Sequence, residues 1–147
     1  MRNNIRRNII RKTNRGQGLL ELALVLPFLL VIVFGVLDLG RVFFTTINLL
    51  SAAREGVRHL TAYPEDVNHD YKPYWETKQV TYNEARNSSL NLEMEKIIPF
   101  CEHIEDPDTC DSGKPAQVTV TSNFDLVLGW LLPSPITITR TAYMVIP

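Results

Sequence analysis

The N-terminal part of the sequence holds the first residues whose types and spacing could support chemistry. Gly16 ends a basic segment, and a single glutamate, Glu21, follows five residues later at the start of an apolar run. Glycine has no Cβ, so a peptidase can approach an extended backbone closely at this residue. A lone carboxylate at the edge of an apolar run is a functional candidate, because a charge is costly in a bilayer. These features together predict a membrane-inserted precursor that is cut at its cytoplasmic boundary.

The two cysteines, Cys101 and Cys110, offer chemistry of a second kind. They lie in the part of the chain that we place outside the membrane, where disulfides persist, so we expect a disulfide between them. It would stabilise the fold by about 2–3 kcal/mol for so short a loop. The alternative is a metal site that also uses His103 and Asp108. Zinc sites usually show a tighter C-x₂₋₄-C spacing, so we expect no metal.

The three histidines are scattered, and His103 lies in the densest titratable cluster of the chain. The acidic residues around it are Glu102, Glu105, Asp106 and Asp108. The cluster has no nucleophile and base at a catalytic spacing, and the chain has no Gly-rich phosphate loop. A calcium-binding adhesive tip that adds Asp111 is a further alternative, but it lacks the glycine-spaced calcium-loop pattern. We therefore expect a solvated surface, no enzyme and no cofactor.

Charge is divided unevenly along the chain. Residues 1–16 carry six basic residues and no acidic one, which leaves nine basic and sixteen acidic residues, a net charge of −7, for the remainder. By the positive-inside rule the basic end stays in the cytoplasm and the acidic body crosses the membrane. The alternative for the basic end is a nucleic-acid-binding arm. The apolar run follows it directly, so we expect no nucleic acid partner.

The apolar run is long enough to span a bilayer. Leu22 to Leu37 are sixteen uncharged residues, and the run reaches twenty if Gly18–Glu21 are included. About 20 residues that rise about 1.5 Å each cross a hydrocarbon core of about 30 Å. A removed signal peptide has an apolar region of about 7–15 residues followed closely by a cleavage site with small residues. The small residues at 51–53 lie well beyond the run, so we expect a retained anchor.

Beyond the membrane segment, apolar residues recur at spacings of three and four, as in an amphipathic helix that continues out of the bilayer. They are Ile47, Leu50, Ala53, Val57 and Leu60. A weaker pattern predicts a second helix from about Thr81 to Met94. The chain then divides into a basic cytoplasmic leader (1–16), a transmembrane helix (17–38), an extracytoplasmic helix extension (39–62) and a small extracytoplasmic domain (63–147).

Near the C-terminus the period changes to two. Apolar residues alternate in 117–124 and again in 136–145, which predicts two strands paired antiparallel. The eleven residues that join them, 125–135, are unusually apolar. We expect this connection to fold back over one face of the sheet; the alternative is a patch for a partner subunit or the outer membrane surface. The predicted class is α+β, a long N-terminal helix followed by a second helix and an antiparallel sheet.

Three blocks of the sequence resemble a known family. The stretch RGQGLLELALVLPF at 15–28 is similar to the start of TadE-like proteins, which are minor pilins or pseudopilins of the tight-adherence (Flp-type) pilus system. DLGR at 38–41 and AAREGVR at 52–58 resemble the family's next recurring blocks. The resemblance is strong over residues 15–60 and architectural afterwards.

The resemblance implies that a prepilin peptidase cuts the chain on the cytoplasmic side. Gly16 would be the last leader residue, Gln17 the new N-terminus and Glu21 position five. A cut after Gly18 is a second frame, which would put Glu21 at position three. The other implied partners are pilins or pseudopilins, inner-membrane platform proteins and the lipid bilayer. The implied location is the bacterial inner membrane, single-pass, with incorporation into a surface pilus as a further outcome.

Two charged features of the helix follow from these assignments. Glu21 would lie near the positive end of the helix dipole, where it marks the peptidase substrate or pairs with a freed α-amino group of its own or an adjacent subunit. The ordinary alternative is a glutamate that extends to water. Asp38 and Arg41, three residues apart, predict an ion pair at the outer interface that stabilises the helix by roughly a few tenths of a kcal/mol.

We therefore expect a structural or assembly component of a tight-adherence pilus, acting in surface attachment or secretion. The alternative is a membrane-anchored extracytoplasmic binding protein, with a metal-binding adhesive domain, that is unrelated to pili.

Overall fold

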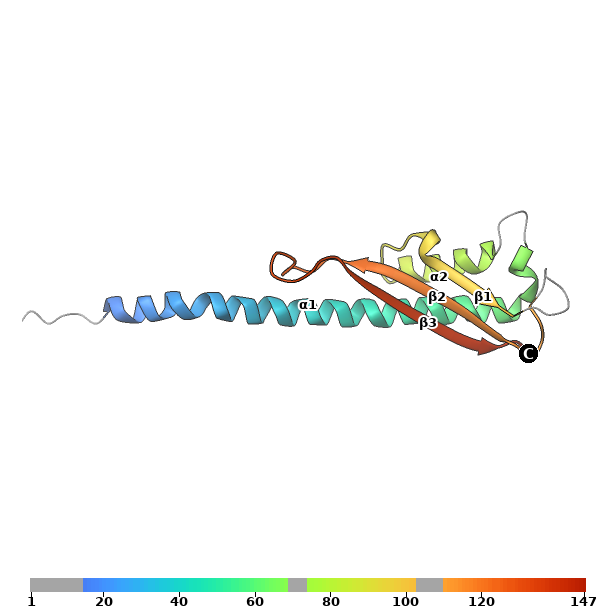
Figure 1. The fold of residues 1–147 in the computed structure, drawn as a ribbon, viewed down its shortest axis with the longest axis horizontal. Coiled ribbons are helices and arrows are strands. Elements are labelled where there is room, and N and C mark those ends of the chain that lie inside the picture. Colours follow the sequence, from blue (N-terminus) through green and yellow to red (C-terminus); the bar gives the residue numbers. More distant parts are fainter. Residues whose placement is uncertain (1–14, 69–73, 103–109) are drawn as a thin grey trace, which may run out of the picture.

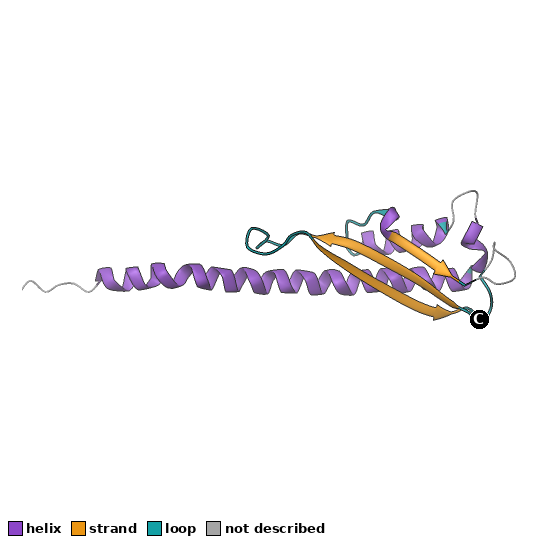
Figure 2. Ribbon diagram, viewed as in Figure 1, coloured by secondary structure: helices purple, strands orange, loops and turns teal. Residues whose placement is uncertain are grey.

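The computed structural model of the protein describes residues 15–68, 74–102 and 110–147, and it shows a long helical rod with a small α+β head on its C-terminal half (Figures 1 and 2). The elements, in order, are α1 (Arg15–Ala62), the 3₁₀ turn η1 (Pro64–Asn68), α2 (Trp75–Asn87), the 3₁₀ turn η2 (Met94–Lys96), β1 (Ile97–Cys101), β2 (Pro115–Phe124) and β3 (Ile136–Val145). The predicted class and element order, a long helix followed by a second helix and an antiparallel sheet, are confirmed.

The rod α1 is one helix of 48 residues that continues through Pro27. At about 1.5 Å per residue it is about 72 Å long. Its two halves lie in different surroundings. Residues 16–30 are exposed on every side, whereas one stripe of the second half is buried under the head. The N-terminal part of α1 is therefore exposed, whereas its C-terminal half forms one side of the domain core.

The buried stripe of α1 is rich in small residues. Its members are Leu49, Ala52, Ala53, Gly56, Val57 and Leu60. A Cβ added at Gly56 would collide with the Thr81 side chain of α2 and lie 3.3 Å from Cγ1 of Val118. The small residues thus allow α2 and β2 to approach the α1 backbone closely. The predicted stripe was partly wrong, since Ile47 is exposed and Leu50 is half-buried, and the buried face is centred on Leu49 instead.

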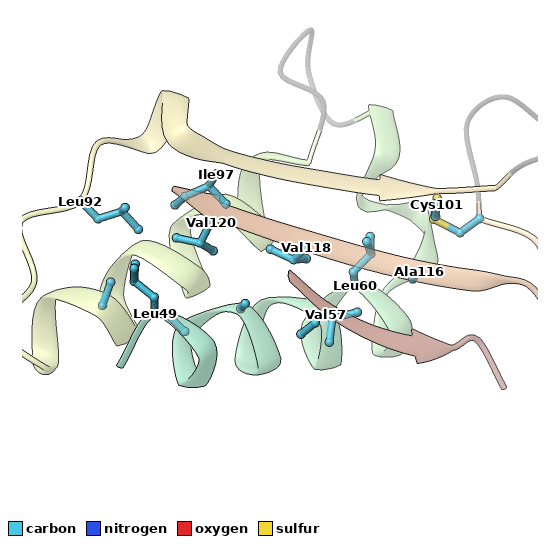
Figure 3. Packing of buried hydrophobic residues seen from close by; sticks show 14 of the residues in the cluster. Leu49, Val57, Leu60, Leu92, Ile97, Cys101, Ala116, Val118 and Val120 are labelled. Atoms are coloured by element: carbon cyan, nitrogen blue, oxygen red, sulfur yellow. A yellow bond between two sulfur atoms is a disulfide. The ribbon is translucent and has the colours of Figure 1, made fainter. Parts of the chain in front are cut away.

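The sheet has the order β1-β2-β3, with both pairs antiparallel. The central strand β2 sends Ala116, Val118 and Val120 into the core, where they meet Val57 and Leu60 of α1 (Figure 3). Ile97 and Cys101 of β1 and Leu92 complete the other side of this cluster (Figure 3). The core therefore joins the C-terminal half of α1 to the sheet.

The structure corrects the position of the second helix. It spans Trp75–Asn87 rather than Thr81 to Met94. Its buried positions are Thr77, Thr81 and Ala85, a helical stripe that a search for apolar residues does not detect. The helix ends before the apolar residues Leu90, Leu92 and Met94. There Ser89 adopts a left-handed conformation (φ 60°) and the Leu90 N–H donates to the Ala85 carbonyl at 3.0 Å, a Schellman-type end.

A third strand, β1, was not predicted. Its five residues contain Pro99. Proline cannot donate to a sheet ladder and is tolerated at a sheet edge, and β1 is an edge strand. Its alternate residues Ile97, Pro99 and Cys101 are buried, as expected for a strand that covers the core with one face.

Candidate functional site: the bare helix and its outer end

Residues 16–30 of α1 form an apolar surface without a partner among the described residues. Leu24, Phe28 and Ile32, which follow one another by four residues, each expose 67–68% of their surface, and Leu22, Leu26 and Leu30 on other faces are exposed too. A helix that is apolar all round needs an apolar environment, either protein or lipid. By length and composition α1 can cross a membrane. This part of the structure is suited to a single membrane anchor.

The proposed processing residues lie in the first turns of this helix. Since α1 begins at Arg15, the Gly16–Gln17 peptide bond is helical, whereas a peptidase needs an extended backbone there. The first helical N–H groups have no intrahelical acceptor, and glycine weakens a helix, so unwinding this turn costs little. Among the described residues, none has an atom within 4 Å of a Cβ built at Gly16 or Gly18. Packing within the chain therefore does not explain either glycine.

Glu21 is exposed at the N-terminal end of the apolar surface. Its Oε1 atom accepts a hydrogen bond from the Gln17 side-chain amide at 3.4 Å, one helical turn earlier. Removing a leader after Gly16 would place the new α-amino group on the residue that already contacts this carboxylate. The contact observed is with the Gln17 side chain, so the pairing of Glu21 with a freed α-amino group stays a prediction.

At the outer end of the apolar run, Asp38 connects α1 to a segment that lies far away in the sequence. The Asp38 side chain is buried, with the residue 5% exposed, and its two oxygens accept the N–H groups of Val127 and Leu128 at 2.9 and 3.0 Å. Arg41 lies 3.3 Å from the same carboxylate, and its guanidinium carbon lies 4.8 Å from the ring centroid of Phe124. We call this arrangement the Asp38 clamp. Sequence reasoning identified the Asp38–Arg41 pair but missed the backbone donors.

The segment held by the clamp is the connection between β2 and β3, residues 125–135, which we call the 125–135 loop. The expectation that it covers one face of the sheet is wrong. It projects beyond the end of the sheet, toward the N-terminal half of α1 (Figure 1). Leu128 is buried, and its Cδ1 atom lies 3.9 Å from the position of a Cβ on Gly35. The loop therefore runs along the helix instead of over the strands.

The third block of the family resemblance, 52–58, has a structural role in this chain. Ala52, Ala53 and Val57 are buried in the core, whereas Arg54 and Arg58 are exposed. Arg58 lies 3.9 Å from Glu55, a pair that water screens strongly. This block fixes the head to the rod and brings no chemically active group into the core.

Cys101 and Cys110 form a disulfide with their Cα atoms 5.7 Å apart. The disulfide joins the end of β1 to the segment that starts at Cys110. This segment is also held by a hydrogen bond, in which the Cys110 N–H donates to the Pro64 carbonyl at 3.0 Å. The Tyr74 hydroxyl lies 3.8 Å from the Cys101 sulfur, and burial raises the pKa of this phenol. The bridge thus stabilises the far end of the head.

The metal alternatives involve residues outside the described part of the chain. His103, Glu105, Asp106 and Asp108 fall in the gap between 102 and 110. Within residues 15–68, 74–102 and 110–147, the structure contains no group of three or more residues that could hold a metal ion.

Comparison with known proteins gives one match. No curated protein and no solved structure matches the chain. The matched family segment covers the bare half of α1, the Asp38 clamp residues on that helix and the buried block 52–58, and it stops before the rest of the head. Residues 16–58 match the family model described as TadE-like protein, so over this segment, which is less than half of the chain, the protein is similar to the TadE-like family.

Proposed function

We propose that the protein is a TadE-like minor pilin or pseudopilin, a non-enzymatic structural or assembly component of a tight-adherence (Flp-type) pilus that serves attachment or secretion. One observation carries the proposal. The segment that matches the family is also the segment whose first half exposes apolar side chains on every face. Such a helix suits a precursor that is first held in a bilayer and later packs against the helices of other pilins.

The membrane topology follows from charge. The basic leader remains in the cytoplasm, residues 17–38 span the inner membrane, and the net-acidic head lies outside. Asp38 and Arg41 then lie at the outer boundary. A prepilin peptidase acts at the cytoplasmic boundary, and the platform proteins and neighbouring pilins meet the chain through its helix.

Cleavage after Gly16 is the favoured frame. It leaves Gln17 as the N-terminus and Glu21 at position five, one helical turn away. The absence of any packing reason for Gly16 among the described residues supports selection by an external enzyme. Removing the leader also takes away six positive charges, which would otherwise repel the leaders of adjacent helices at the same depth.

Glu21 is proposed to act in recognition and in packing. A carboxylate that enters the bilayer edge with a neighbouring helix needs a positive partner, and the freed α-amino group of its own or an adjacent chain can supply one. The hydrogen bond between the Gln17 side chain and Glu21 supports this role, because cleavage after Gly16 would make Gln17 the first residue.

Two measurements test the proposal. Intact mass and N-terminal sequencing of the membrane-extracted protein should find Gln17 at the N-terminus. An intact Met1 would show an uncut anchor, and a start near Arg54 would show a removed signal; either result contradicts the proposal. In the second measurement, Glu21→Ala should lower the amount of the protein in sheared pili or in the platform by about tenfold, since a lost partner of about 1.4 kcal/mol has that effect.

The matched control is Glu55→Ala, the same substitution on the exposed side of the same helix. Glu55 lies in the head, and its pair with Arg58 is screened by water. Its incorporation should equal that of the native chain. Normal processing and incorporation of Glu21→Ala would refute the role given to this glutamate.

A further inference from the structure

The 125–135 loop carries an apolar surface that the head does not cover. Residues 126–135 contain no charged side chain. Val127, Trp130, Leu131 and Leu132 are all exposed, Trp130 to 76%. Exposed apolar residues that adjoin one another mark a surface that contacts a membrane or another molecule.

The location of the loop indicates which partner it meets. Leu128 contacts α1 at Gly35, three residues before Asp38, so the loop reaches about 4.5 Å into the apolar run at 1.5 Å per residue. Figure 1 shows the loop as the part of the head that extends furthest along α1 toward the N-terminus. If α1 spans the bilayer up to Leu37, this loop lies at the depth of the outer headgroups and the first acyl carbons.

Most backbone N–H groups of the loop are satisfied within the protein, whereas those of Trp130 and Ser134 have no acceptor among the described residues and need water or a lipid headgroup. An irregular segment can enter an apolar medium only if its N–H groups are satisfied. Val127 and Leu128 donate to Asp38, and Leu126 donates to the Ser134 hydroxyl at 3.3 Å. Further N–H groups bond within the loop: those of Gly129 to the Leu126 carbonyl, and of Leu131 and Leu132 to the Leu128 carbonyl. Pro133 and Pro135 have no N–H to satisfy.

The side chains fit the same interpretation. Tryptophan favours the membrane–water interface, where its ring is in apolar surroundings and its N–H reaches water or headgroups. The charged residues flanking the loop's attachment, Arg41 and Asp125, lie toward the head, and Arg41 is 51% exposed on its side chain. The polarity of this region thus changes from charged to apolar along the direction in which α1 enters the bilayer.

We propose that the 125–135 loop inserts into the outer leaflet of the bilayer beside α1, with Trp130 as its interfacial anchor. This inference rests on the proposed membrane topology and adds a second membrane contact to it. A lipid occupant is favoured because the loop lies beside α1 at Gly35, whose neighbours Phe34 and Val36 on the apolar run are themselves exposed.

The chain has two tryptophans, so each can be followed alone. Trp75→Phe leaves Trp130, and the matched control Trp130→Phe leaves Trp75, which begins α2 in the head. Each full-length variant is reconstituted into phosphatidylcholine–phosphatidylglycerol vesicles with and without acyl-chain bromine. Bromolipid should lower Trp130 emission at least about twofold, and Trp75 emission by less than about a tenth, since Trp75 lies outside the interface. Thermal melts matching the native chain establish that both variants are folded.

The outcomes separate the two proposals. Vesicle flotation reports anchoring by α1 independently of fluorescence. A chain that floats while Trp130 is quenched by aqueous iodide and not by bromolipid overturns loop insertion and leaves the anchor intact. A chain that floats while Trp130 is shielded from both quenchers shows a protein partner, such as a second copy, and also overturns insertion. A chain that does not float overturns both.

Discussion

Replacing Asp38 with alanine should release the 125–135 loop from α1 without unfolding the head. The carboxylate accepts two backbone N–H groups at 2.9 and 3.0 Å, and alanine leaves both donors without their acceptor. Hydrogen bonds to a charged group contribute about 1.5–3 kcal/mol each. Taking the lower value for both, the substitution shifts the loop's opening equilibrium by about 3 kcal/mol, or about 100-fold.

Two substitutions give a graded comparison. Asp38→Asn keeps one side-chain oxygen as an acceptor and loses the charge, so it should raise opening by about tenfold, which is one lost bond of about 1.5 kcal/mol. Arg41→Gln removes only the half-exposed partner of the pair, and such pairs contribute about 0–1 kcal/mol after screening by water. It should therefore raise opening by less than about fivefold.

Hydrogen exchange of the full-length protein in one detergent measures these effects. The Val127 and Leu128 amides should exchange faster in the order Asp38→Ala, Asp38→Asn, Arg41→Gln, native. The amide of Val118, in the central strand, should not change, because the clamp lies outside the core that holds β2. Unchanged Leu128 exchange in Asp38→Ala, or an equal effect of Arg41→Gln, would refute the assignment of the clamp to Asp38 and the two N–H groups.

Two further predictions concern the head. Gly56→Ala should destabilise it by about 1–3 kcal/mol in thermal or denaturant unfolding, because the new methyl group would collide with the Thr81 side chain. Gly40→Ala is the control on the same helix: no described atom lies within 4 Å of its added Cβ, so it should be neutral or stabilise by up to about 1 kcal/mol. A neutral or stabilising effect of Gly56→Ala, like that expected of Gly40→Ala, would refute close packing at Gly56. Reduction of the bridge, or replacement of Cys101 and Cys110 together by serine, should lower the free energy of unfolding by about 2–3 kcal/mol; unchanged unfolding would show that the bridge adds no stability.

The elements that sequence predicted well are those whose signal is periodic and local. The strands at 115–124 and 136–145 alternate apolar residues over most of their length, with breaks at Ser122 and Arg140, so their pairing could be anticipated. The long helix followed from an apolar run without a strong breaker other than Pro27. In each case the residues that determine the element lie inside it.

The second helix was misplaced because its determinants lie elsewhere. Asp66, nine residues before the helix, accepts N–H groups of its first turn, at 3.2 Å for Glu76 and 2.7 Å for Thr77. Its buried face depends on threonines, one of which, Thr81, satisfies its hydroxyl on the Thr77 carbonyl at 2.8 Å. A search for neighbouring caps and apolar residues detects neither feature.

The contacts of the candidate site could likewise be predicted from the sequence only in part. The spacing of Asp38 and Arg41 predicted a weak pair on one helix. The main partners of Asp38, however, are the N–H groups of residues about 90 positions later, and backbone donors leave no mark in the sequence. The direction of the 125–135 loop was missed for the same reason, since composition shows that a loop is apolar and does not show what it contacts.

The clamp and the membrane helix depend on each other. Asp38 is the first charged residue after the apolar run, and a carboxylate at the edge of a bilayer is unfavourable unless its oxygens are satisfied. On α1 alone, Arg41 would be its nearby cation, and that side chain is half exposed. The loop supplies two further donors and at the same time places Leu128 against Gly35. In the proposed membrane topology, the C-terminal head therefore makes a buried charge tolerable at the depth where the helix would leave the bilayer. This coupling explains why a loop between two strands is apolar at its tip and polar at its attachment.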